Sequence, residues 1–159
     1  MKKLNNKGFS LVELIIVIAI MAILVGVVGT QVIPYLENSR KAKDNQIFSA
    51  WNTAAVSAYS TEAGNVDAGK TYTIKVDDSG IGCNASPSAD NKGETAIKKT
   101  FLELTDLAAT GYDFSKMASK AGKDVDYVEI EVNGGNGQVV TTVTNKTPSK
   151  YSFDSIENK

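Results

Sequence analysis

Hydrophobic and polar positions divide the chain into three parts. After a short polar and basic start, every residue from Leu14 to Gly29 is apolar or glycine. A helix from Phe9 to Ile33 would be about 37 Å long, which is enough to cross a bilayer with some tilt. Because this helix is apolar on all sides, we expect lipid or other helices to surround it.

Beyond Pro34 the pattern becomes amphipathic. Between residues 36 and 59, apolar side chains recur at three- and four-residue steps, with charged and polar side chains between them. This spacing predicts one helix from about Phe9 to about Ala63, whose second half lies against a globular head. Trp51 falls on the apolar face and is expected to be a core residue.

The remaining residues mix strand and helix patterns. Alternating apolar and polar residues predict half-buried strands, and a glycine-rich stretch between two of them predicts a hairpin loop. The predicted elements are strands at 72–76, 128–132 and 139–143, a hairpin loop at 133–137, a helix at about 94–108, a short helical turn at 114–121 closed by Gly122, and a surface loop from Asp77 to Gly93. The predicted fold class is α+β, a long helical spine packed against a small antiparallel sheet.

Glu13 is a carboxylate at the edge of the apolar run. An acidic group near the bilayer centre costs roughly 2.5–3.5 kcal/mol, and less near the interface. An ionisable side chain in such a segment is a functional hypothesis by default, and it calls for a partner of opposite charge.

The residues Gly8-Phe9-Ser10-Leu11-Val12-Glu13, between a basic leader and an apolar helix, resemble the N-terminus of a type IV prepilin. The resemblance covers about the first third of the chain. It implies that a prepilin peptidase cleaves between Gly8 and Phe9 and methylates the new amine of Phe9. It also implies that Glu13 pairs with the N-terminal amine of a neighbouring subunit during assembly.

This resemblance implies a domain organisation and a set of partners. The expected parts are a leader at 1–8, a transmembrane and assembly helix at 9–33, its amphipathic continuation at 34–63 and a globular head at 64–159. Lysines of the leader favour a single-pass precursor in the cytoplasmic membrane with the leader inside. The expected partners are further copies in a helical filament, the prepilin peptidase, the pilus assembly platform with its ATPase, minor pilins, and the membrane before assembly.

Composition limits the chemistry. The chain has no histidine, which removes Ser-His-Asp and Cys-His mechanisms and imidazole metal ligation. The only cysteine, Cys83, rules out an internal disulfide and is interpreted as an incidental thiol in a polar loop, with intermolecular pairing as the alternative. Many members of the resembled family close their C-terminal region with a disulfide, so this departure favours a Gram-positive or otherwise disulfide-poor bacterium. No cofactor or metal is expected, and a net charge of −1 argues against nucleic acid. A calcium site is an alternative interpretation of one acidic segment. Its spacing does not match the EF-hand loop, so a solvated strand edge is the better interpretation. The four acids are Asp124, Asp126, Glu129 and Glu131.

The predicted function is therefore not enzymatic. The chain is expected to be a structural subunit of an extracellular type IV pilus that serves adhesion, twitching motility or biofilm formation. A pseudopilin of a type II secretion or DNA-uptake machine, a membrane-anchored extracellular binding module and a plain signal-anchor helix remain alternatives. The basic cluster Arg40-Lys41-Lys43 fits lipid headgroups, a neighbour's acids or simple solvation.

Overall fold

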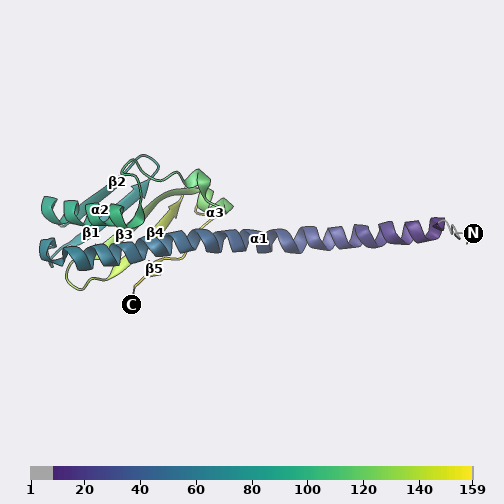
Figure 1. Cartoon of the computed structure of the whole chain (residues 1–159), viewed down its shortest axis with the longest axis horizontal. Coiled ribbons are helices and arrows are strands. Elements are labelled where there is room, and N and C mark those ends of the chain that lie inside the picture. The colour runs from purple at the N-terminus through teal and green to yellow at the C-terminus, as the bar shows by residue number, and fades with distance from the viewer. Residues whose placement is uncertain (1–8, 159) are drawn as a thin grey trace, which may run out of the picture. The chain divides into compact units, whose positions relative to one another are not determined.

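The computed structural model describes residues 9–158 and shows a long helix, a five-stranded sheet and a second helix (Figure 1). The elements in chain order are α1 (Leu11–Glu62), η1 (Ala63–Asn65), β1 (Thr71–Asp77), β2 (Ile81–Ser86), α2 (Asn91–Thr105), η2 (Phe114–Lys116), α3 (Lys120–Lys123), β3 (Val125–Asn133), β4 (Val139–Asn145) and β5 (Ile156–Glu157). A long N-terminal apolar helix followed by an antiparallel sheet confirms the predicted α+β class.

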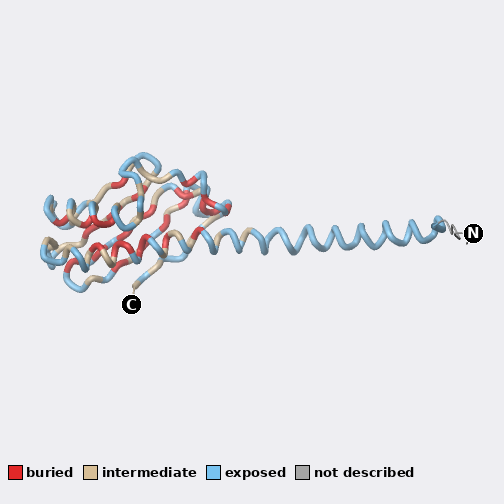
Figure 2. The backbone as a smooth tube through the Cα atoms, in the orientation of Figure 1, coloured by how far each residue is buried: buried red, intermediate tan, exposed pale blue. Residues whose placement is uncertain are grey.

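Helix α1 contains Pro34 and continues to Glu62, as the single predicted helix required. Contacts divide the chain into two compact units, one ending at Asn38 and the other comprising Ser39–Lys159. The second half of α1 therefore belongs to the globular unit. In Figure 2 the buried residues gather in that unit, whereas the N-terminal half of α1 is exposed along its length.

The sheet is antiparallel, with strand order β2-β1-β3-β4-β5. The register aligns the buried residues of neighbouring strands, so that Ile74 pairs with Ile130 and Ile130 with Thr141. All three are completely buried, because alternate residues of paired strands share one face of the sheet. The predicted strands at 72–76, 128–132 and 139–143 are confirmed as β1, β3 and β4.

One face of the sheet carries the core. The buried face of α1, with Phe48 and Trp51, and that of α2, with Ile97 and Phe101, join the buried strand residues in one hydrophobic cluster. Trp51 is 4% exposed and is a core residue, as predicted. The alternate strand positions form the opposite, more polar face of the sheet and include Thr73, Lys75, Glu129 and Glu131.

Three predictions about the globular unit are wrong in part. The segment Asp77–Gly93 is not only a loop, because residues 81–86 form β2, which pairs with β1. The predicted helical turn at 114–121 is instead two short elements, η2 and α3, and Gly122 lies inside α3 rather than closing the turn. The acids of β3 lie on the central strand of the sheet and not on a strand edge.

A buried amide joins α1 to the last two strands. Asn52 Nδ2 lies 3.0 Å from Thr141 Oγ1, 3.2 Å from the Ile156 carbonyl oxygen and 3.4 Å from the Val139 carbonyl oxygen. Strand β5 consists of two residues, and the Asn158 backbone N–H adds a bond of 3.1 Å to the Val139 carbonyl oxygen. Asn52 thus fixes a short strand that has little pairing of its own.

Candidate functional site

The start of α1 is a reciprocal capping arrangement. The Ser10 backbone N–H donates to Glu13 Oε2 at 2.8 Å, while the Val12 N–H donates to Ser10 Oγ at 3.4 Å. The Leu14 N–H reaches the Ser10 carbonyl oxygen at 3.2 Å, which closes the first turn. Ser-x-x-Glu at this position is the capping box, in which both side chains satisfy backbone donors that lack a helical partner.

The electrostatics of this turn favour a negative charge. The N-terminal end of a helix carries a partial positive charge, so a carboxylate in the first turn is stabilised there. Glu13 thus has a local donor within its own chain, the Ser10 N–H. Of the two residues at the predicted cleavage position, Phe9 is 89% exposed and Gly8 lies outside the described residues.

The apolar surface of the N-terminal half of α1 is open. Every residue from Phe9 to Leu36 is exposed in the single chain, although most are large aliphatic side chains. By length and composition α1 is able to cross a membrane. A surface of this kind needs either lipid or other helices around it, as the sequence predicted.

Comparison with known families bears on this segment. The model of the prokaryotic N-terminal methylation motif matches residues 3–29. The chain has the N-terminus of a type IV pilin-like prepilin. No curated protein and no solved structure gives a significant match.

The matched segment contains all the predicted site residues, namely Gly8, Phe9 and Glu13. Cleavage after Gly8, methylation of Phe9 and pairing of Glu13 with a neighbour's amine remain predictions. The structure adds Ser10 to this set, since its backbone and its hydroxyl both take part in the first turn with Glu13. The Ser-x-x-Glu spacing was the signal in the sequence that could have identified Ser10.

A second polar site of the pilin-like chain is buried in the globular unit. Asp44, on α1, is 1% exposed and accepts the Ala118 N–H at 2.9 Å and the Ser119 N–H at 2.8 Å, together with the Ser119 hydroxyl. A Cβ at Gly122 would lie 2.3 Å from Asp44 Oδ2, so only glycine fits beside the carboxylate. Asp44 therefore fastens α1 to the segment that leads into α3.

Sequence reasoning missed this role, because Asp44 stands among the charged and polar residues that follow Pro34. The signal was its spacing, because Asp44 precedes Phe48 by four residues and thus falls on the buried face of α1. A carboxylate on an apolar stripe of a helix requires donors, and the N–H groups ahead of α3 supply them.

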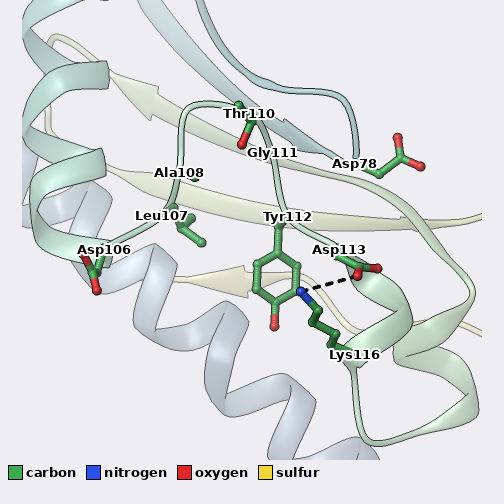
Figure 3. Close-up of a pocket in the computed structure, with 9 residues that line it drawn as sticks. All are labelled: Asp78, Asp106, Leu107, Ala108, Thr110, Gly111, Tyr112, Asp113 and Lys116. Carbon is green, nitrogen blue, oxygen red and sulfur yellow. Dashed lines mark ion pairs between the residues drawn. The ribbon is translucent and has the colours of Figure 1, made fainter.

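A surface pocket with a volume of about 440 Å³ lies beside the loop between α2 and η2 (Figure 3). An ion pair of 3.5 Å joins Lys116 Nζ to Asp113 next to Tyr112. Burial raises the pKa of Tyr112, and the Asp44 and Asp113 carboxylates add to this effect. The lining residues are Asp78, Asp106, Leu107, Ala108, Thr110, Gly111, Tyr112, Asp113 and Lys116. Within residues 9–158, no group of three or more His, Cys, Asp and Glu side chains is arranged to hold a metal ion.

Cys83 differs from its predicted place. It lies in β2 on the side of the sheet that faces the core, not in a polar loop, and it packs against the hydrophobic cluster. Burial raises the pKa of the Cys83 thiol to about 12, and the Glu94 carboxylate contributes in the same direction. The reactive form of cysteine is the thiolate, so this thiol is held in its unreactive state.

Proposed function

We propose that the chain is a structural subunit of a type IV pilus, processed between Gly8 and Phe9, methylated at Phe9 and polymerised through its N-terminal helix. The observation that carries this proposal is the exposed apolar surface from Phe9 to Leu36, together with the methylation motif at its start. A helix that is apolar on every side is suited to lipid in the precursor and to a bundle of identical helices in the filament.

The energetics of assembly give Glu13 its proposed role. Moving α1 from lipid into a helix bundle exchanges one apolar environment for another, so packing and polar contacts decide the outcome. In the single chain, Glu13 Oε2 accepts the Ser10 N–H. A Phe9 ammonium from a neighbouring copy would offset the charge of Glu13 in the bundle and so favour one axial register over others.

The other partners follow from this role. The precursor would sit in the cytoplasmic membrane as a single-pass protein with its head outside, and the assembled pilus would lie outside the cell. The prepilin peptidase, the assembly platform with its ATPase and minor pilins would act on it or join it. Adhesion, surface motility and biofilm formation are the roles that we propose for the filament. The proposed role is structural, in keeping with the methylation motif.

Mass spectrometry of the mature protein tests the processing step. We expect a chain that begins at a methylated Phe9 and lacks residues 1–8. A mature protein that retains Met1 and the leader would overturn the cleavage, and a free Phe9 amine would overturn the methylation. A monomer that keeps its leader in membrane extracts would favour the membrane-anchored binding module instead.

Variants at the first turn separate charge from capping. Glu13→Gln keeps an acceptor for the Ser10 N–H but loses the charge, and we expect it to be processed normally while filaments disappear from electron micrographs. Ser10→Ala is the matched control, because it removes the capping hydroxyl and leaves the carboxylate, and we expect filaments to persist. Normal filaments from Glu13→Gln would refute the proposed charge pairing.

Electron microscopy distinguishes the two filament classes that share this N-terminus. Long surface filaments composed mainly of this chain would favour a major pilin. Their absence, with the chain found in a secretion or DNA-uptake machine, would favour a pseudopilin.

A further inference from the structure

Three basic segments of the globular unit are fastened together near the point where α1 enters it. Asp44 on α1 binds the backbone ahead of α3, and Asn145 Nδ2 at the end of β4 donates to the Ala121 carbonyl oxygen at 2.7 Å. The Lys146 N–H donates to the Asp124 carbonyl oxygen at 2.8 Å. Figure 1 shows α3 beside α1 at this end of the unit. We call the cations of these segments the basic collar: Arg40, Lys41, Lys43, Lys120, Lys123, Lys146 and Lys150.

The cations of the basic collar lie on the surface. All are exposed except Lys41, which is half-buried with its Nζ 5.2 Å from the centre of the Phe153 ring. The acids of the same segments are fewer, and two of them are engaged in structural bonds. Asp44 is buried, and the carboxylate of Asp124 accepts both the N–H and the hydroxyl of Thr147 at 2.8 and 3.0 Å.

The basic collar follows the apolar run closely along the chain. Arg40 and Lys43 stand seven and ten residues after Ile33, which corresponds to about 10–15 Å along a helix. The headgroup layer extends about 5–8 Å beyond the hydrocarbon on each side. For a bilayer whose hydrocarbon ends at Ile33, the collar would begin within about one Debye length, roughly 8 Å at physiological salt, of the lipid phosphates.

We propose that the basic collar docks the head of the membrane-anchored precursor on anionic lipid headgroups. The partner is the phosphate plane of the bilayer that α1 spans, and the attraction is electrostatic. Cations that follow the span on the outer side of the membrane oppose the orientation that the leader lysines favour. An attraction of these cations to anionic lipid would compensate for that unfavourable effect. The inference rests on the proposed function for the anchored precursor, and the contact would be released on entry into the filament.

Lysine labelling of the full-length chain in lipid nanodiscs tests this docking. An amine-reactive reagent and mass spectrometry would compare neutral phosphatidylcholine discs with discs that also contain phosphatidylglycerol. We expect severalfold lower labelling of Lys43, Lys120 and Lys146 in anionic discs, and recovery of labelling at high salt. Lys98 and Lys99 on α2 lie outside the basic collar and serve as internal controls, with labelling that is equal in both lipids.

A pair of double variants supplies the matched control. Lys120→Gln with Lys123→Gln should reduce the protection of Lys43 and Lys146 in anionic discs, whereas Lys98→Gln with Lys99→Gln should leave it unchanged. Equal labelling of the collar in both lipids, with the chain anchored, would overturn the docking alone. Protection that occurs in filaments but not in anionic discs would also overturn it and assign the collar to contacts between copies. A chain that fails to enter the discs would overturn the proposed function as well.

Discussion

At the scale of single residues, Asp44 shows how a charge is accommodated in the core. A buried carboxylate is tolerated only where hydrogen-bond donors replace water, and here two backbone N–H groups and one hydroxyl do so. The donors come from a segment more than seventy residues away in the sequence. The charge itself was visible in the sequence, but its partners were not, because they are set by tertiary packing.

Asp44→Ala should lower the free energy of unfolding of the globular unit by about 3 kcal/mol, because it leaves buried donors without an acceptor. Thermal unfolding followed by circular dichroism would measure the change. Asp126→Ala, at an exposed position of β3, is the control and should change stability by less than about 0.5 kcal/mol. A similar small effect at Asp44 would show that the buried hydrogen bonds contribute little.

Cys83 should make the globular unit sensitive to alkaline pH. Its folded pKa of about 12 exceeds the ordinary value of 9.0, so between these values the thiol ionises in the unfolded chain and stays protonated in the folded chain. The stabilisation is therefore complete below about pH 9 and is lost as the pH rises toward 12, with about 1.4 kcal/mol gone near pH 10. Melting temperatures of the native chain and of Cys83→Ala across this range would show the difference. Parallel curves would contradict the prediction.

At the scale of elements, the predicted strands were those with strong alternation. Ile74 in β1 and Ile130 in β3 stand in runs of β-branched residues separated by polar ones, which specifies a half-buried strand locally. Strand β2 was missed because Gly82, Cys83 and Ala85 have little intrinsic strand preference. It forms through pairing with β1 and through packing against the core, and neither is encoded in its own residues.

Other parts of the globular unit accept hydrogen bonds from the free edge of β2. The Ile81 N–H donates to the Ala109 carbonyl oxygen at 3.2 Å, and the Ala85 N–H donates to Glu94 Oε1 at 2.8 Å. An edge strand with unpaired backbone groups is a site for unwanted pairing with other chains. These contacts occupy donors of β2 that would otherwise be available to a second sheet.

Asn52→Ala should loosen the C-terminal strand selectively. The variant removes the amide that reaches Thr141 and Ile156, so β5 loses a hydrogen bond to α1. We expect a loss of about 1–2 kcal/mol and faster hydrogen exchange around residue 156, with β1 unchanged. Thr53→Ala, one residue later and exposed, serves as the control. Unchanged exchange near residue 156 would show that β5 is held by other contacts.

At the scale of the whole molecule, the two units differ in what stabilises them. The core cluster begins at partly buried Ile47 and fully buried Phe48, so its residues all belong to Ser39–Lys159. The change of pattern after Pro34 predicted that the second half of the long helix lies against the head. The sequence could not show that α1 belongs to the globular unit from Ser39 onward, because that boundary depends on contacts with distant strands.

A fragment of residues 39–159 should therefore fold alone. We expect a soluble monomer with a cooperative thermal transition and with the same slowly exchanging amides as the full-length chain, because the apolar segment contributes nothing to its core. Size-exclusion chromatography and hydrogen exchange would check this. Aggregation, or a broad transition without protected amides, would show that the N-terminal half of α1 is needed for folding.

The capping of α1 by Ser10 and Glu13 has a consequence for proteolysis. Proteases bind their substrates as extended segments, and a helical bond must first unwind to fit. Because α1 begins at Leu11, the carboxyl side of the expected scissile bond, at Phe9, already lies outside the helix. A peptidase would then bind the Phe9 side of the bond without unwinding α1, which would stay folded through the cut.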